Sequence, residues 1–333
     1  MNKKLLVIIC FIILIISILI VSLLITSSFT NNTVDNTYNL VTDISITDNL
    51  LNQADEANDI YSDIIGLSLS EEEFPKLDGS TATIPLGEAL AAFMMSKDRG
   101  ECKKYTKFSG TNDAYKRLVD RKADLLLVYE KPNDADEYLQ HNSTEIEMVA
   151  IGKDALVFFV NAKNPINNLS YEQIVDIYSG KITNWKDVGG QDKDIAAFQR
   201  NETSGSQTLM IKLVMKGEAL MPARENYISH TMSGIINAIA DYDNGQFAIG
   251  YNMYYYVTEM NEDPNIKILS IDKIFANKAT ILGGEYPFVN DFYAAIRKNT
   301  PEQNPERLLF RWLQSTEGQA LIESEGYSIL SKK

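Results

Sequence analysis

The chain has 333 residues, a formal net charge of −14 and 45% hydrophobic residues. This length allows one large two-lobed domain or two small ones. The negative charge argues against a nucleic-acid partner, which would require a basic face. Two cysteines, Cys10 and Cys102, exclude a disulfide framework, and no cysteine or histidine spacing matches a metal site. We therefore expect no bound metal and no cofactor.

The N-terminal segment predicts a membrane anchor. Residues 5–25 are almost wholly apolar and follow two lysines. About 20 such residues span a bilayer, and the lysines favour a cytoplasmic N-terminus. We expect 1–28 to form a single-pass anchor in the cell membrane that holds the rest of the chain outside the cell; a cleaved signal peptide is the alternative. Residues 29–71, rich in Asn, Thr, Asp and Ser, are predicted to form a flexible stalk.

From Pro75 onward, patterns typical of strands and of helices alternate. This alternation predicts an α/β fold with a mostly parallel sheet, in which ligands bind where strands end and helices begin. Ser170 and Gln173 form a capping box that starts one predicted helix, and Gly180 ends it. Further strands are predicted over 123–129, 155–160 and 247–251, and further helices from Pro85, from Thr111, over 305–313 and over 317–322.

The turn at 200–207 carries the most specific chemistry in the chain. A predicted buried strand precedes it and a predicted helix follows it. Ser204 and Gln207 fit a capping box, and Gly205 lets a bound group approach the backbone. A helix start offers free N–H groups and about half a positive charge, to which Arg200 adds a fixed cation. The turn therefore predicts an oxyanion cradle; an ordinary capped helix with a surface arginine is the alternative.

Two further turns have a similar composition, and each precedes a predicted helix. They are residues 78–85 and 109–113, both rich in serine or threonine. A tetrahedral oxyanion has four oxygens and needs donors from several directions, which hydroxyls and helix-start amides supply. Because the chain is acidic, such a site has to act through aimed donors rather than through a long-range field. The three turns together predict a site for a small oxyanion.

These turns and several other segments match one protein family. The matching segments are 79–85, 164–165, 178–185, 200–206, 248–251, Gly284 with Tyr286 and Pro287, 312–313 and 317–319. On them, from about residue 76 to 330, the chain resembles the phosphate-binding proteins of phosphate ABC importers. The resemblance implies a two-lobed type II periplasmic-binding-protein fold. It also implies capture of inorganic phosphate outside the cell for ABC permease subunits.

The resemblance implies ligands in the first two turns. The family's first turn supplies a hydroxyl and an amide, which fall on Thr83 and Ile84. Ser80 or Thr81 takes their place if the turn is shifted. The family's second turn supplies a hydroxyl that falls on Thr111.

The resemblance also implies ligands in the third turn and one acceptor. The third turn supplies Arg200, Ser204, Gly205 and Ser206. The nearest match to the family's acceptor aspartate is Glu130, a departure in both residue type and local register, and Glu202 is expected to orient Arg200. An acceptor matters because phosphate near neutral pH still carries a proton and sulfate does not. A site built around that bond rejects an analogue lacking it by roughly 10⁴–10⁵.

Taken together, these features predict a two-lobed binding protein. We expect 72–155 with 256–333 to form the first lobe and 156–255 the second, with the cleft closing around the anion. The sequence contains no nucleophile–histidine pair and no phosphate-cradling GxxxxGK[ST] loop, so we expect no enzyme. We expect a monomer. The alternative function is a membrane-tethered oxyanion sensor or scavenger that serves no importer.

Overall fold

The structure describes the body of the chain. A computed structural model describes residues 66–241 and 245–330, so the predicted anchor and most of the predicted stalk lie outside the described residues. Within these ranges, none of the helices has the length and apolar character needed to cross a bilayer. The last residues assigned to the stalk are packed: Leu69 is buried, and its N–H donates to the Met94 carbonyl oxygen at 2.9 Å. The folded body therefore begins before residue 72.

A seven-stranded sheet runs through the described residues. Its strand order is β1-β2-β11-β3-β8-β5, with β9 beside β3. The pairs β1–β2 and β5–β8 are parallel, whereas β3 and β11 run antiparallel to their neighbours. The prediction of a mostly parallel sheet is wrong, because an alternating pattern identifies strands without fixing how distant strands pair. The strands are β1 (Leu77–Gly79), β2 (Leu125–Val128), β3 (Ile146–Asn161), β5 (Ala196–Ala197), β8 (Ala248–Met253), β9 (Ile266–Ile268) and β11 (Val289–Arg297).

Two short strand pairs lie outside this sheet. Strand β4 (Asn168–Leu169) pairs with β10 (Ser270–Ile271), and β6 (Gln199–Arg200) pairs with β7 (Ile228–Ser229); both pairs are parallel. The second pair holds the start of the turn at 200–207 against the segment that precedes residue 230.

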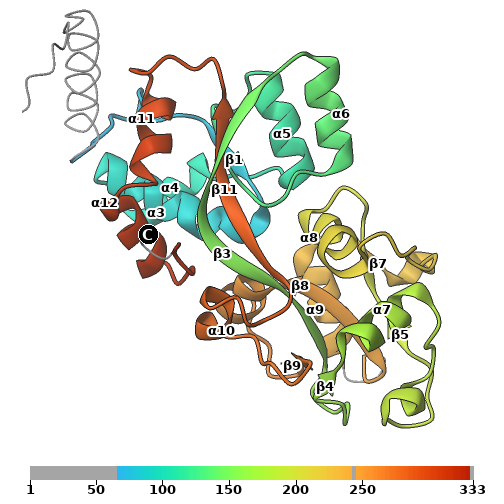
Figure 1. Cartoon of the computed structure of the whole chain (residues 1–333). Helices are drawn as coiled ribbons and strands as arrows, with labels where there is room; N and C mark the ends of the chain where they lie inside the picture. Colours follow the sequence, from blue (N-terminus) through green and yellow to red (C-terminus); the bar gives the residue numbers. More distant parts are fainter. Residues whose placement is uncertain (1–65, 242–244, 331–333) are drawn as a thin grey trace, which may run out of the picture. The chain divides into compact units, whose positions relative to one another are not determined.

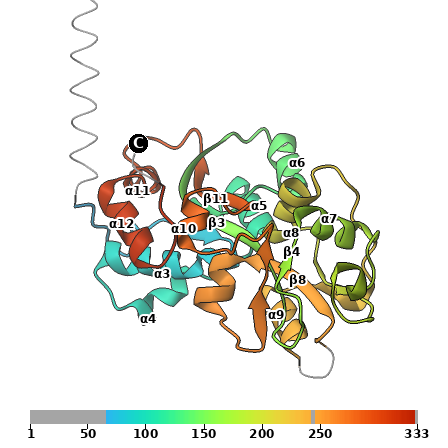
Figure 2. The same cartoon turned by 60° about the horizontal axis from the view of Figure 1, so that its bottom comes forward.

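The first lobe contains the helices predicted from Pro85, from Thr111 and near the C-terminus. The helices of this lobe are α3 (Ile84–Met95), α4 (Arg99–Cys102), α5 (Thr111–Val119), α6 (Asn133–His141), α11 (Pro305–Trp312) and α12 (Thr316–Ser324), with 3-10 turns η1 (Thr81–Thr83) and η2 (Lys103–Tyr105). In α3, Leu86, Leu90 and Met94 are fully buried. Phe93 of the same helix is 51% exposed, and its ring centroid lies 5.2 Å from that of Trp312. Figure 2 shows α3, α4, α11 and α12 lying together.

Helix α7 (Tyr171–Ser179) of the second lobe begins and ends as predicted. The Ser170 hydroxyl accepts from the Gln173 N–H at 3.1 Å, and the Gln173 side chain accepts from the Ser170 N–H at 2.8 Å. Gly180 ends the helix with φ 84°, a left-handed conformation that favours glycine. The other helical segments are η3 (Trp185–Val188), α8 (Gly205–Leu209) followed by the π-helix η4 (Met210–Met215), η5 (Glu225–Tyr227), α9 (Met232–Ala240), the π-helix η6 (Tyr256–Met260) and α10 (Lys278–Leu282).

Strand β3 joins the two lobes. Its residues 146–155 pair with β11, whereas 156–160 pair with β8 and are fully buried within the main apolar core. Figure 1 shows β3 passing from the lobe of α5 and α6 into the lobe of α7 and α9. The predicted two-lobed α/β body is confirmed. Strand β9 pairs with β3 and β10 pairs with β4, so the second lobe extends past the predicted boundary at 255. The chain then re-enters the first lobe with β11, which pairs with residues 146–155 of β3.

The substitution Gly79→Ala tests how closely β1 and β2 pack. A methyl group at Gly79 would lie 2.1 Å from the Leu127 carbonyl oxygen of β2. Because that neighbour is backbone, we expect the free energy of unfolding to fall by about 1–3 kcal/mol, measured by urea unfolding. Gly100→Ala is the control, since its methyl group would meet only the flexible Asp98 carboxylate, at 2.9 Å. An equal loss in both variants would contradict the packing argument.

Candidate oxyanion-binding site

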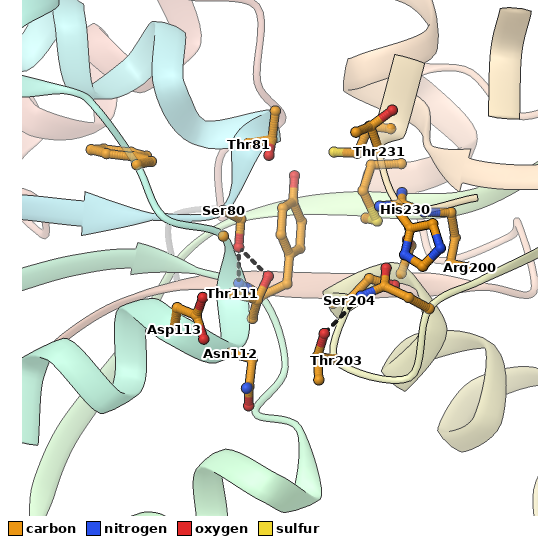
Figure 3. Close-up of a pocket in the computed structure, with 18 of the residues that line it drawn as sticks. Ser80, Thr81, Thr111, Asn112, Asp113, Arg200, Thr203, Ser204, His230 and Thr231 are labelled. Carbon is orange, nitrogen blue, oxygen red and sulfur yellow. Dashed lines mark hydrogen bonds between the residues drawn. The ribbon is translucent and has the colours of Figure 1, made fainter. Parts of the chain in front are cut away.

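A cavity of about 390 Å³ lies between the two lobes and is lined by all three hydroxyl-rich turns. Figure 3 shows Ser80 and Thr111 on one wall, with Ser204 and Arg200 on the opposite wall. Thr111 belongs to the first lobe and Ser204 to the second, so the turns converge on one space as an oxyanion site requires. The turns contribute Ser80, Thr81, Ser109, Gly110, Thr111, Asn112, Asp113, Arg200, Asn201, Thr203, Ser204, Gly205 and Ser206 to the lining.

The first turn presents Ser80 and Thr81 to the cavity instead of Thr83 and Ile84. Thr83 is fully buried, and its hydroxyl donates to the carbonyl oxygens of Leu127 at 2.7 Å and Ser80 at 2.9 Å. Ile84 does not line the cavity. The expected positions are therefore corrected to the alternative pair, because the Thr83 hydroxyl already secures the turn to β2.

The second turn is held in place by a buried carboxylate. Asp78, only 1% exposed, accepts from the Ser109 N–H at 2.7 Å and from the Ser109 hydroxyl at 2.8 Å, and it pairs with Arg117 at 2.7 Å. This fixes the start of α5, where the Thr111 and Ser80 hydroxyl oxygens lie 2.8 Å apart. In that bond one hydroxyl donates to the other, which leaves one hydrogen for a ligand.

The third turn starts α8 with only half of the predicted capping box. The Ser204 hydroxyl accepts from the Gln207 N–H at 3.1 Å, as predicted. The Gln207 side chain, however, accepts from the Arg200 N–H at 3.1 Å and from the Tyr251 hydroxyl. Gln207 thereby ties the Arg200 backbone to the core. Gly205 and Ser206, the first two residues of α8, line the cavity, and a helix start leaves such N–H groups without a partner within the helix.

Arg200 is a buried cation without an anionic partner in the described part of the chain. Its exposed fraction is 6%. Its Nε donates to the Ser229 carbonyl oxygen at 3.1 Å and its Nη1 donates to the Ser206 hydroxyl at 3.3 Å. Burial lowers the pKa of its guanidinium, while Tyr251 and Tyr256 act in the opposite direction. An anion in the cavity would offset this loss of hydration.

Glu202 does not orient Arg200. It is exposed and lines a neighbouring cavity instead. The expectation that it would pair with the guanidinium is therefore corrected; the Ser229 carbonyl oxygen and the Ser206 hydroxyl orient Arg200 in its place.

Glu130 lies outside the cavity, contrary to its expected place as the acceptor. Its carboxylate pairs with Lys212 of the second lobe at 2.9 Å, and Lys212 also donates to the Lys131 carbonyl oxygen at 3.1 Å. Among the described lining residues, Asp113 alone carries a carboxylate, and it is exposed. Glu130 thus connects the lobes beside the cavity.

Several lining residues carried no signal in the sequence. Tyr129 directly follows β2, Met253 is the last residue of β8, and Tyr256 follows β8. His230 comes from the connection between β7 and α9, and Met232 is the first residue of α9. A tyrosine after a buried strand is typical of a core, and only the pairing of distant segments brings these side chains to the cavity.

The lining offers hydrogen-bond donors rather than metal ligands. Across residues 66–241 and 245–330, no three His, Cys, Asp or Glu side chains gather as a metal site requires. One cation, several hydroxyls and helix-start amides are the groups expected to hold a small oxyanion.

Residues 76–315 match the family model described as the PBP superfamily domain, which is well over half of the chain. The chain belongs to the PBP superfamily. The match begins just before β1 and ends after α11, so it includes both lobes and all three turns of the cavity.

Two relatives with similar sequences are phosphate-binding proteins by name. The phosphate-binding protein PstS of Bacillus subtilis is 29% identical over 154 residues, which cover 46% of this chain and 45% of that protein. The phosphate-binding protein PstS of Borreliella burgdorferi is 24% identical over 181 residues, or 52% of this chain and 62% of that protein. The chain thus spans about half of the length of these curated relatives. The predicted resemblance to phosphate-binding proteins is confirmed.

The fold is also shared with a solved structure. The crystal structure of an ABC-type phosphate transport receptor from Vibrio cholerae is 23% identical with a TM-score of 0.57, and the match covers 76% of this chain and 98% of that one. At this identity, the likeness shows that the PBP fold is common to both chains.

Removal of the Asp78 carboxylate tests its role in holding the second turn. We expect Asp78→Ala to lower the free energy of unfolding by about 2–3 kcal/mol, because the Ser109 donors lose a charged acceptor. Glu145→Ala is the control: its carboxylate is 74% exposed and pairs with Lys298, away from this turn, so its loss costs at most about 1 kcal/mol. Thermal unfolding of both variants measures the difference, and equal losses would contradict this role.

Proposed function

We propose that this chain binds inorganic phosphate outside the cell and delivers it to an ABC-type importer. The observation that carries the proposal is Arg200, a buried guanidinium with no carboxylate partner among the described residues. A desolvated cation is costly unless it is paired, so its place in an open cavity favours an anion from solution. The names of the relatives, phosphate-binding protein PstS and phosphate transport receptor, support phosphate as that anion.

Both lobes contribute donors to the proposed phosphate site. The Ser204 oxygen accepts from Gln207, so its hydrogen is free to point at the anion. The Ser80 and Thr111 pair has one hydrogen left over. The proposed ligands are the hydroxyls of Ser80, Thr81, Thr111, Ser204 and Ser206, the N–H groups of Gly205 and Ser206, and the guanidinium of Arg200.

Cleft closure follows from this division of donors. A methyl group at Gly205 would lie 2.6 Å from the Thr111 hydroxyl oxygen of the other lobe, so the lobes already approach closely at the site. Lys212 bridges to Glu130 nearby. An anion that contacts both walls stabilises the closed arrangement over any open one, because only the closed arrangement completes its set of donors.

The proposal includes the setting of the protein. We propose that the apolar segment 5–25 anchors the chain in the cell membrane by a single pass, with the body outside. The body acts as a monomer, docks on ABC permease subunits and releases phosphate unchanged, without catalysis. The phosphate transport receptor named among the similar structures supports the importer as partner.

The substitution Arg200→Ala tests the proposed charge pairing. Hydrogen bonds to charged groups contribute about 1.5–3 kcal/mol, so we expect phosphate affinity to fall by roughly 10- to 100-fold. Isothermal titration of the full-length chain in detergent measures it. Arg224→Ala is the control, since Arg224 is exposed and lies outside this cavity. Unchanged phosphate affinity in Arg200→Ala would remove Arg200 from the site.

The substitution Gly205→Ala tests closure separately from charge. The added methyl group would meet the Thr111 hydroxyl at 2.6 Å only when the lobes are together. We therefore expect weaker phosphate binding, by at least tenfold, with little change in the thermal stability of the unliganded chain. Small-angle scattering should show less compaction on addition of phosphate than in the wild type. Full compaction and full affinity would contradict closure at this contact.

A further inference from the structure

Asp154 lies where β3 passes from one lobe to the other. Residue 155 is the last of β3 to pair with β11, and residue 156 is the first to pair with β8. The Asp154 residue is only 2% exposed. Burial disfavours the charged form of a carboxylate, so an aspartate buried at this crossing costs stability unless other groups compensate for it.

Hydrogen bonds tie Asp154 to a cavity-lining tyrosine and to the segment that follows β8. Its Oδ2 accepts from the Tyr129 hydroxyl at 2.7 Å, and its Oδ1 accepts from the N–H groups of Ala155 at 2.7 Å and Tyr255 at 3.2 Å. Tyr129 also lines the oxyanion cavity, and Tyr255 follows β8. One side chain, Tyr129, therefore separates the hinge carboxylate from the proposed phosphate.

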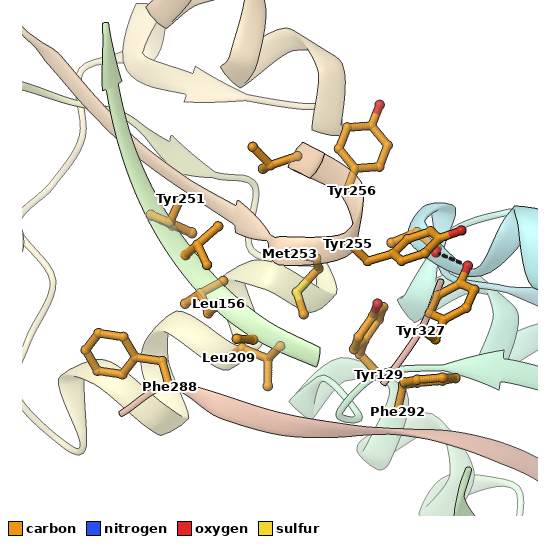
Figure 4. Packing of buried hydrophobic residues seen from close by; sticks show 14 of the residues in the cluster. Tyr129, Leu156, Leu209, Tyr251, Met253, Tyr255, Tyr256, Phe288, Phe292 and Tyr327 are labelled. Carbon is orange, nitrogen blue, oxygen red and sulfur yellow. Dashed lines mark hydrogen bonds between the residues drawn. The ribbon is translucent and has the colours of Figure 1, made fainter. Parts of the chain in front are cut away.

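The ionisable groups that face Asp154 are tyrosines. They are Tyr129 from the end of β2, Tyr254 and Tyr255 from the segment after β8, and Tyr327 from the C-terminal segment. Figure 4 shows Tyr129, Tyr255 and Tyr327 near one another. The rings of Tyr255 and Tyr327 are stacked, with their centroids 3.7 Å apart.

No cation among the described residues forms an ion pair with Asp154; its neighbour Lys153 pairs with Asp291 instead, at 2.9 Å. Burial raises the pKa of Asp154 to about 6, against the hydrogen bonds from Tyr129, Ala155 and Tyr255, which lower it. Near neutral pH the carboxylate is therefore largely ionised, but close to the point where it takes up a proton.

We propose that Asp154 is a positioning residue that couples phosphate binding to the uptake of a proton at the hinge. The inference rests on the proposed function. A phosphate in the cavity places negative charge across Tyr129 from the Asp154 carboxylate. Like charges that share a poorly hydrated region disfavour each other, so the bound anion favours neutral Asp154. The proton comes from the buffer and is added to the carboxylate; no bond to phosphorus forms or breaks.

The pH dependence has a definite sign. Because the anion raises the pKa of Asp154 further, uptake occurs between about pH 6, the pKa of free Asp154, and the higher pKa of the bound form, above which both forms are ionised. At about pH 4, Asp154 is protonated in both states and contributes no uptake. The hinge then holds a neutral carboxyl before the anion arrives.

Isothermal titration of the full-length chain with inorganic phosphate tests the coupling. Titrations at about pH 6.5, in two buffers of different ionisation enthalpy, give the protons taken up per phosphate bound. We expect the wild type to take up more protons per phosphate bound than Asp154→Asn does, by up to one proton. Protons gained or lost by the phosphate itself are the same for both proteins, so they cancel in this comparison. Asp291→Asn is the matched control, because that partly exposed carboxylate lies beside β3 and faces Lys153. It should match the wild type.

Tyr129→Phe supplies a second test that retains Asp154. It removes a hydrogen bond that lowers the Asp154 pKa, so the uptake should move to higher pH. Equal proton counts in the wild type and Asp154→Asn would overturn the inference while the proposed function stands. If Asp154→Asn does not fold, an unchanged pH profile in Tyr129→Phe overturns it. No heat with phosphate in the wild type would overturn the proposed function and, with it, this inference.

Discussion

One buried charge governs the site. Arg200 lies at the end of β6, where Gln207 fixes its backbone and Ser229 and Ser206 fix its guanidinium. Within the described residues no carboxylate neutralises it, and a desolvated cation without a partner is costly. The rest of the cavity suits a partner from solution. Hydroxyls and helix-start amides add donors without adding charge, so the donor set suits an anion of limited charge and small size.

Strand β3 belongs to both lobes, so the proposed closure of the cleft has to bend or twist this strand. Because one strand belongs to both lobes, the lobes can move about a short crossing while each half of the sheet stays intact. The donors are divided between the lobes, so under the proposed function a bound anion would stabilise one arrangement of that crossing. Asp154 lies at this point and bonds to a cavity-lining tyrosine, which gives the site a direct connection to its own hinge.

Local signals in the sequence predicted local structure. The capping box at Ser170 and the glycine that ends α7 depend on contacts within a few residues, so the chain itself specifies them. The errors arose from contacts between distant segments. The Thr83 hydroxyl bonds to Leu127, 44 residues away, and Glu130 bonds to Lys212, 82 residues away. The direction of β3 and β11 depends on similar long-range pairing, which the order of strands and helices does not encode.

A crystal structure of the chain grown with inorganic phosphate is the most direct test of the central claim. The account predicts phosphate within hydrogen-bonding distance of the Arg200 guanidinium and of hydroxyls from both lobes, Thr111 and Ser204. Phosphate bound elsewhere, with Arg200 paired to a carboxylate of the protein, would contradict it.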